Sequence, residues 1–303
     1  GAVIGMWWGY ILFGRDFKDK TAQQVRDEIA SYQASSGIPM LIGTDEEGGT
    51  VVRASSNPNL FPSREPSPQV LYAQGGLDAI LQDARQKSVT LLDLGVNVNF
   101  APVADVSTDP ADFIYERALG QDAQTTADYV AQVVTVMGQE RIGSVLKHFP
   151  GYGNNQDTHT GVAVDERPYE TFETSDFLPF QAGIQAGADA VLVSHNIVTS
   201  MDESLPASLS PAVHQILRDT LGFDGVILTD DLAMDAVAQY AQDGSAAVLA
   251  VQAGNDMVLT TDFETQIPQV IAAVEDGTIP MEQIDQSVAR VLSWKYDLGL
   301  LGY

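Results

Sequence analysis

The sequence predicts an α/β protein with the TIM-type (β/α)8 barrel fold, built as a single domain over residues 1–303. Short apolar runs alternate with longer helical patterns, and such alternation requires parallel strands joined by crossover helices. The length also fits, because barrels of this type commonly form one domain of about 250 residues or more. No linker, low-complexity tract or internal repeat interrupts the pattern.

Seven segments are predicted as buried strands because they are short, apolar and rich in β-branched or aromatic residues. They are 10–14, 39–43, 96–103, 143–149, 189–195, 225–230 and 256–261. An eighth strand, lost upstream of residue 1, would complete the barrel. Without it the barrel would have an open edge with unpaired backbone groups. A doubly wound open sheet is the alternative fold.

Helices are predicted between these strands, and several begin with Thr, Ser, Asp or Pro, which are helix start signals. They are 21–35, 76–94, 124–140, 177–187, 207–221, 235–253, 263–276 and 281–298.

The net charge of −26, from 41 acidic and 15 basic residues, argues against nucleic acid and anionic membrane surfaces as partners. No stretch approaches the roughly 18 apolar residues of a membrane span. The absence of cysteine excludes disulfides and thiolate chemistry, but it does not decide the compartment. An extracellular or cell-surface location is favoured over the cytoplasm, the oligomeric state stays open, and the missing initiator Met indicates that residues precede Gly1.

Barrel enzymes place their chemistry at the C-terminal ends of the strands and in the loops that follow. The segment KHFPGYGNNQDTH, residues 147–159, follows the fourth predicted strand and contains two of the four histidines. In extended backbone, Asp157 and His159 project to the same side, so the carboxylate can accept the imidazole N–H and leave the other nitrogen free for proton transfer. The alternative is a loop-capping pair without chemistry.

Asp230 and Asp231 end the sixth predicted strand. Adjacent strand residues point in opposite directions, so only one carboxylate can face the barrel axis, and that one is a candidate nucleophile. The alternative is that both cap the next helix.

Other polar residues fall at the same predicted face. Lys147 and His148 end an apolar strand, and Lys147 either donates to substrate hydroxyls or forms an internal ion pair. Asp45, Arg53 and Arg117 could hold a polyol or could be purely structural.

The remaining histidines carry weaker predictions. His195 ends the fifth strand as a candidate substrate-binding residue or as a satisfied strand-end histidine, whereas His214 is expected at a helix surface. A divalent metal is a minor alternative, because no His-x-His or His-x-x-x-His pair occurs.

Seven motifs together resemble glycoside hydrolase family 3, and within it the β-N-acetylglucosaminidase (β-hexosaminidase) branch. They are TDEEGGTVVR (44–53), NFAPVADV (99–106), ERALG (116–120), LKHFPGYGNNQDTH (146–159), VLVSH (191–195), GVILTDDLAM (225–234) and SWKYDLGLLGY (293–303). The resemblance implies a retaining mechanism without a cofactor, in which Asp230 is the nucleophile and His159, supported by Asp157, is the acid and then the base.

The same resemblance implies that Asp45, Arg53, Arg117, Lys147 and His148 bind the sugar. The expected activity is removal of terminal N-acetylglucosamine from cell-wall fragments or chito-oligosaccharides. A phosphorylase or a β-glucosidase on the same scaffold and a non-catalytic sugar-binding protein are the alternatives. The chain departs from the common motif in two ways: Tyr152 stands where His is frequent, and the segment from Gly153 to Asp157 is one residue shorter.

Overall fold

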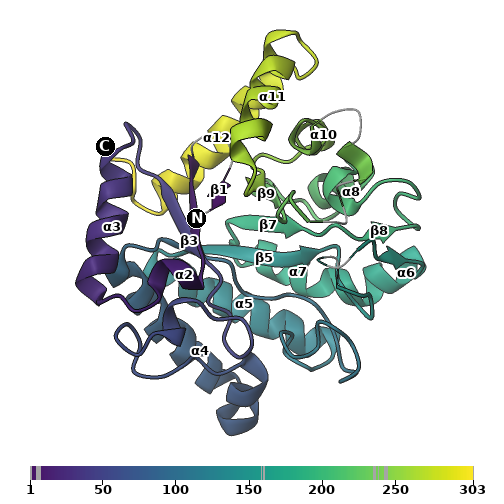
Figure 1. The fold of residues 1–303 in the computed structure, drawn as a ribbon. Coiled ribbons are helices and arrows are strands. Elements are labelled where there is room, and N and C mark those ends of the chain that lie inside the picture. Colours follow the sequence, from purple (N-terminus) through teal and green to yellow (C-terminus); the bar gives the residue numbers. More distant parts are fainter. Residues whose placement is uncertain are drawn as a thin grey trace.

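The protein is described here from a computed structural model, in which residues 2–4, 8–157, 159, 161–234, 237, 239–241 and 245–302 are described. Eight strands form one sheet in the spatial order β10-β1-β2-β3-β4-β5-β7-β9. An isolated parallel bridge between Leu228 and Met257 joins β9 to the segment leading into β10 and closes the ring. The predicted barrel is therefore confirmed, and the alternative of a doubly wound open sheet is wrong (Figure 1). The strands are β1 (Ala2–Ile4), β2 (Gly9–Leu12), β3 (Leu41–Thr44), β4 (Val98–Asn99), β5 (Gly143–Phe149), β7 (Ala190–Val193), β9 (Val226–Thr229) and β10 (Leu259–Thr260).

Strand β1 occupies the barrel position that the sequence pattern left open. It pairs antiparallel with both neighbours, Val3 with Thr260 of β10 and Val3 with Tyr10 of β2, whereas the other paired neighbours in the ring are parallel. The prediction that the first strand is lost upstream of residue 1 is wrong, because β1 pairs with both β10 and β2 and leaves no open edge there. A three-residue strand is too short to give a periodic signal in the sequence.

Helices surround the strands (Figure 1). The main ones are α3 (Ala22–Ala34), α4 (Pro68–Leu94), α5 (Ala123–Glu140), α7 (Phe177–Gln185), α8 (Pro211–Gln215), α10 (Ala246–Ala253), α11 (Phe263–Glu275) and α12 (Met281–Asp297); α2 (Gly14–Phe17) and α6 (Tyr169–Thr171) are short. Side chains of Thr21, Ser67, Asp122, Ser210 and Ser245 accept backbone N–H groups in the first turns of five of them, which satisfies donors that a helix leaves unpaired.

Three predicted helices differ from the structure. Helix α4 begins at Pro68 rather than at residue 76, because a kink with non-helical angles at Gly75 and Gly76 divides it and hides its first part from a pattern search. The prediction for 207–221 becomes a 3₁₀ turn at Ala207–Leu209, α8, and a π-helical segment at Ile216–Thr220. The helix predicted over 235–253 is described only in part: it has a 3₁₀ turn at Gln239–Ala241 and α10 from Ala246, while residues 235, 236, 238 and 242–244 lie outside the described residues.

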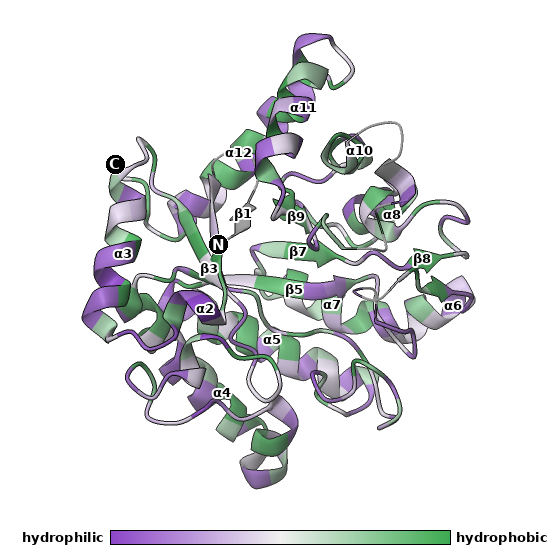
Figure 2. Ribbon diagram, in the orientation of Figure 1, coloured by the Kyte–Doolittle hydropathy of each residue, from purple (hydrophilic) through white to green (hydrophobic). Residues whose placement is uncertain are grey.

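The core has two layers because successive strand residues point to opposite faces. Ile11, Leu192 and Leu228 point into the barrel and belong to the inner cluster, while Leu12 and Val191 pack against the helices in the outer cluster. Figure 2 accordingly shows hydrophobic strands at the centre, surrounded by helices that carry both hydrophobic and hydrophilic residues. Side chains of the inner cluster therefore fill the interior of the barrel.

His214 contradicts its prediction as a surface residue, since it is only 3% exposed. Its Nδ1 lies 2.7 Å from the carbonyl oxygen of Ser210, and its ring packs over Gly254 at the end of α10. Burial lowers the pKa of His214, so the ring is neutral near pH 7.

In the described part of the chain, the helices all fall short of the length and apolarity needed to span a bilayer.

Candidate active site

A cavity of about 340 Å³ opens at the C-terminal ends of the strands. It is lined by Ile11, Phe13, Asp45, Val51, Arg53, Phe100, Arg117, Lys147, His148, Tyr152, His159, Leu192, Asp230, Asp231, Met234 and Leu259. Seven of the nine predicted site residues are among them, and the other two, Asp157 and His195, each contact a lining residue. The volume lies in the range of about 300–1,000 Å³ that is usual for small-molecule sites.

Lys147 forms an internal ion pair at the wall of this cavity. Its side chain is 2% exposed, and Nζ lies 2.6 Å from Oε1 of Glu47 and 2.8 Å from Oδ1 of Asp45. Burial lowers the pKa of Lys147, but Asp45 and Glu47 outweigh burial and leave the pKa above its ordinary value. The amine is therefore charged and has one further N–H to offer to a bound molecule.

Glu47 joins Lys147 to Arg117. The guanidinium of Arg117 donates to both carboxylate oxygens of Glu47, through Nε at 3.0 Å and Nη2 at 2.7 Å. Burial raises the pKa of Glu47, but Lys147 and Arg117 more than offset this and hold it well below its usual range. Glu47 was not predicted as a site residue, although it stands beside Asp45 at the end of β3.

The neighbouring Glu46 points the opposite way and holds the loop that carries Arg53. It accepts the backbone N–H groups of Arg53 at 2.9 Å and Ala54 at 2.7 Å. The glycines that follow are required at this turn: Gly48 has φ +99°, and a Cβ there would lie 2.1 Å from the carbonyl oxygen of Pro66. Arg53 is thereby placed with Nη2 3.8 Å from Oδ2 of Asp45, and its buried Nε has no partner among the described residues.

His148 is fixed by Asp105, a second residue that the sequence reasoning missed. Its Nδ1 lies 2.8 Å from Oδ2 of Asp105, whose Oδ1 accepts the backbone N–H of Tyr152 at 2.7 Å. The carboxylate is an acceptor, so Nδ1 carries the proton and Nε2 accepts from Nη2 of Arg117 at 3.2 Å. The sequence feature that could have identified Asp105 is its position just after the apolar segment that follows β4.

The two adjacent aspartates at the end of β9 have different environments. Oδ1 of Asp230 accepts the backbone N–H of Asp231 at 2.8 Å, and no described residue donates a hydrogen bond to Oδ2. The Asp231 carboxylate instead accepts the N–H groups of Ala233 at 3.0 Å and Thr261 at 3.4 Å. Asp231 thus ties the turn after β9 to the segment after β10, and Asp230 presents a carboxylate oxygen without a described donor at the cavity.

Asp230 is ionised at neutral pH. Burial raises its pKa, but His195, His148 and the Asp231 N–H outweigh burial and leave the pKa below its ordinary value, with a smaller contribution from His159. An ionised carboxylate is the form that can act as a nucleophile.

Asp157 and His159 form a pair on the loop after β5. Oδ1 of Asp157 lies 2.7 Å from Nδ1 of His159 and 2.9 Å from its backbone nitrogen. The carboxylate therefore accepts a hydrogen bond from Nδ1–H, and the His159 side chain, which is 59% exposed, keeps Nε2 for proton exchange.

Arg167 holds the start of this loop in place. Its guanidinium pairs with Asp165 and Asp176 at 2.7 and 3.0 Å and donates to the carbonyl oxygen of Gly151 at 3.1 Å. Asp165 belongs to β6 (Val164–Asp165), which pairs with β8 (Ile197–Val198) in a small second sheet. The start of the loop that carries His159 is thus tied to Arg167, and its end pairs through β6 with β8.

His195 lies behind the cavity and is fully buried. Its Nε2 donates to the carbonyl oxygen of Asp231 at 2.8 Å, and its Nδ1 lies 2.7 Å from Oγ of Ser208. Both nitrogens have protein partners, so the structure places His195 where it supports the backbone beside Asp230.

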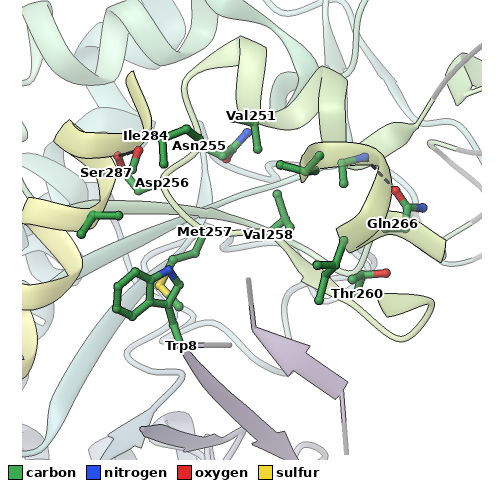
Figure 3. A pocket seen from close by; sticks show the side chains of 14 residues that line it. Trp8, Val251, Asn255, Asp256, Met257, Val258, Thr260, Gln266, Ile284 and Ser287 are labelled. Carbon is green, nitrogen blue, oxygen red and sulfur yellow. Dashed lines mark hydrogen bonds between the residues drawn. The ribbon is translucent and has the colours of Figure 1, made fainter. Parts of the chain in front are cut away.

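A second cavity, of about 40 Å³, lies among Trp8, β10, α10, α11 and α12 (Figure 3). Its walls are mainly apolar, and its one carboxylate, Asp256, is paired with Arg218 at 2.6 Å and with Arg290 at 3.0 Å. A space of this size has room for one or two water molecules. It is a packing gap, not a second reaction site.

Among the residues that the structure describes, no group of three or more His, Asp or Glu side chains is arranged to hold a metal ion.

We expect Glu47→Gln to lower the free energy of unfolding by about 3 kcal/mol, because it leaves two buried cations short of a counter-charge. The ionised Glu47, with its lowered pKa, stabilises the fold above the unfolded pKa of about 4.3. This contribution is lost as the pH falls through the folded-state pKa, so the variant should show a flatter loss of stability on acidification.

Urea unfolding of both proteins from pH 7 down to pH 3 measures this effect. The exposed Glu166→Gln is the matched control and should stay within about 0.5 kcal/mol of wild type. Equal stabilities of wild type and Glu47→Gln at pH 7 would contradict the role given to Glu47.

The chain is similar to known proteins in sequence and in fold. Residues 7–294 match the family model described as "Glycosyl hydrolase family 3 N terminal domain". A protein named beta-hexosaminidase from Stenotrophomonas maltophilia is 37% identical over 293 residues, covering 94% of this chain and 85% of the relative. One of the same name from Xanthomonas campestris pv. campestris is 32% identical and covers 97% of this chain and 85% of the relative.

Solved structures are similar as well. A glycoside hydrolase family 3 β-N-acetylglucosaminidase from Paenibacillus sp. superposes with a TM-score of 0.89 at 32% identity over 97% of this chain, which spans 57% of that longer chain. A β-N-acetylhexosaminidase from Beutenbergia cavernae gives a TM-score of 0.83 at 28% identity, covering 96% of this chain and 89% of that one.

Proposed function

Because the chain belongs to glycosyl hydrolase family 3, we propose that this glycoside hydrolase is an exo-acting, retaining β-N-acetylhexosaminidase. Its proposed substrates carry terminal β-linked N-acetylglucosamine, on cell-wall fragments or chito-oligosaccharides. The observation that carries the proposal is that His159, held by Asp157, and the free carboxylate oxygen of Asp230 face one cavity. A cavity near the small end of the usual range suits one terminal sugar better than the middle of a polymer.

In the first step, Oδ2 of Asp230 forms a bond to the anomeric carbon while the bond from that carbon to the aglycone oxygen breaks. The protonated Nε2 of His159 gives its proton to the departing oxygen. Asp157 accepts the Nδ1–H throughout, which stabilises the charged imidazole before transfer and fixes the ring orientation. A covalent glycosyl-enzyme with inverted configuration results.

In the second step, water attacks the anomeric carbon from the face that the aglycone left. Its proton passes to Nε2 of His159, and Asp230 departs as a carboxylate. Two inversions give net retention. The buried His195 has a positioning part in this scheme, because it holds the carbonyl of Asp231 and thereby the backbone that donates to Asp230.

We assign the binding of the sugar hydroxyls to the charged side chains around Glu47. Lys147 has one further N–H, and Arg53 has a buried Nε without a partner in the described part of the chain. Arg117 and His148 are fixed by Glu47 and Asp105, so their directions are set before a ligand binds. Such preorganisation lowers the entropy cost of binding a polyol.

A panel of p-nitrophenyl β-glycosides that differ only at C2 tests the substrate class. We expect kcat/KM for the 2-acetamido glycoside to exceed that for the 2-hydroxy glycoside by at least about 100-fold, a difference of roughly 2.7 kcal/mol. A preference for the 2-hydroxy glycoside would replace the proposal with a β-glucosidase, and turnover of neither compound would favour a sugar-binding protein.

A phosphorylase is the second candidate, because an imidazole acid/base carries less negative charge than a carboxylate and repels phosphate less. Product analysis with and without phosphate separates the two. Free N-acetylglucosamine in both conditions supports hydrolysis, whereas N-acetylglucosamine 1-phosphate formed in phosphate buffer supports the phosphorylase.

A further inference from the structure

We propose that Phe113 forms a binding platform for the aglycone sugar and favours oligosaccharides over substrates with small leaving groups. This inference rests on the proposed function, since it names the part of the substrate that lies outside the catalytic cavity. Phe113 belongs to the loop between β4 and α5 and is not one of the residues predicted from the sequence.

Three rings form a row from the cavity wall to the surface. His148 and Tyr152 both line the cavity, and their ring centroids are 5.4 Å apart at an interplanar angle of 82°. The next ring is that of Phe113, 5.6 Å from Tyr152 and tilted by 47°. Tyr152 is 3% exposed, whereas Phe113 is 38% exposed. The row therefore ends in an aromatic surface next to the cavity.

The backbone on either side of Phe113 is held firmly. Oγ of Ser107 donates to the carboxylate of Asp112 at 2.7 Å, and the next residue, Ile114, is fully buried. The carbonyl of Ile114 also accepts the N–H groups of Arg117 and Ala118, both at 3.0 Å. These contacts therefore fix the loop so that Phe113 faces outward, and packing against Tyr152 sets the orientation of its ring.

The position of the proton donor decides where the aglycone must lie. His159 has to reach the glycosidic oxygen, so the aglycone leaves the cavity beside the loop that carries His159. Tyr152 belongs to the same loop and is the inner partner of Phe113. A pyranose presents C–H groups on one face, and these pack favourably against the negative face of an aromatic ring while removing apolar area from water.

A competing surface follows the same loop. A groove of about 590 Å³ is lined by Asn154–Gln156 and Val162–Arg167 and includes two exposed aliphatic side chains, Val162 and Val164. This groove shares no lining residue with the catalytic cavity, whereas Tyr152 belongs to the cavity wall and contacts Phe113. We therefore place the aglycone on the Phe113 side and use Val164 as the control.

The experiment compares two substrates that share the terminal sugar. N,N′,N″-triacetylchitotriose has a sugar aglycone, and 2-acetamido-2-deoxy-β-glucosyl fluoride has none. The measured quantity is the ratio of kcat/KM for chitotriose to kcat/KM for the fluoride. In Phe113→Ala we expect this ratio to fall about tenfold, with the fluoride rate unchanged. Phe113→Trp should keep the ratio within about twofold of wild type, and Val164→Ala should do the same.

An unchanged ratio in Phe113→Ala would overturn the proposal, as would a reduced ratio in Val164→Ala alone. Equal losses on both substrates would also overturn it, because they would indicate a disturbed His148 rather than a lost platform. Failure of the wild-type protein to release sugar from either substrate would instead count against the proposed function itself.

Discussion

Asp230→Ala should lower kcat for p-nitrophenyl N-acetylglucosaminide by about 10⁴-fold or more, because no covalent intermediate can form without its carboxylate. The structure supports this residue over its neighbour. Asp230 leaves Oδ2 without a partner among the described residues, while the Asp231 carboxylate accepts the N–H groups of Ala233, in the turn after β9, and of Thr261, just after β10. Steady-state rates with purified protein measure the effect.

The matched control is Asp231→Asn, which removes the adjacent charge but keeps an acceptor for the N–H of Ala233. We expect this variant to stay within about tenfold of wild type, because its side chain takes no part in the proposed chemistry. Near-normal hydrolysis by Asp230→Ala would remove the residue from the nucleophile role. A larger loss in Asp231→Asn than in Asp230→Ala would transfer that role to the neighbour.

External anions give a second readout for the same variant. Alanine leaves space where the carboxylate was, so azide can attack an activated 2,4-dinitrophenyl glycoside from that side. The expected product is the α-glycosyl azide, since a single displacement inverts the configuration. Structural damage alone would give no such product.

The sequence was most informative where position along a strand sets direction. Lys147, His148 and Asp230 fall at or just beyond strand ends, and barrels bring these ends together, so they could be predicted as neighbours without coordinates. The residues that hold these side chains in place could not be predicted in the same way. Glu46 and Glu47 are chemically equivalent neighbours, yet one binds the loop at Arg53 and Ala54 and the other binds Lys147 and Arg117.

The choice between those two glutamates depends on the exact end of β3, and strand boundaries are the least certain part of a sequence-based prediction. The error on His214 has a related cause. A histidine in a helix is buried or exposed according to which side of the helix another element covers, and here the ring lies over Gly254. No local pattern around residue 214 records that long-range contact.

His159→Ala should slow poor leaving groups far more than good ones. Positioned general acids usually contribute about 10²–10⁴-fold, and their help matters most when the departing oxygen is strongly basic. We therefore expect losses in this range for chito-oligosaccharides. The loss should be only a few-fold for the 2,4-dinitrophenyl glycoside, because 2,4-dinitrophenolate leaves without being protonated. A series of aryl glycosides of graded phenol pKa should give a steeper dependence of log kcat/KM on that pKa in the variant.

Two further variants separate the imidazole from its support. In Asp157→Ala the ring remains but loses the acceptor 2.7 Å from Nδ1, so its losses should be intermediate and should follow the same leaving-group trend. Asn154→Ala, in the same loop but exposed, should match wild type across the series. Uniform losses across all leaving groups in His159→Ala would exclude proton donation and leave the histidine with a role in binding only. A leaving-group dependence that appears in both His159→Ala and Asp157→Ala, and not in Asn154→Ala, would assign the proton transfer to the pair.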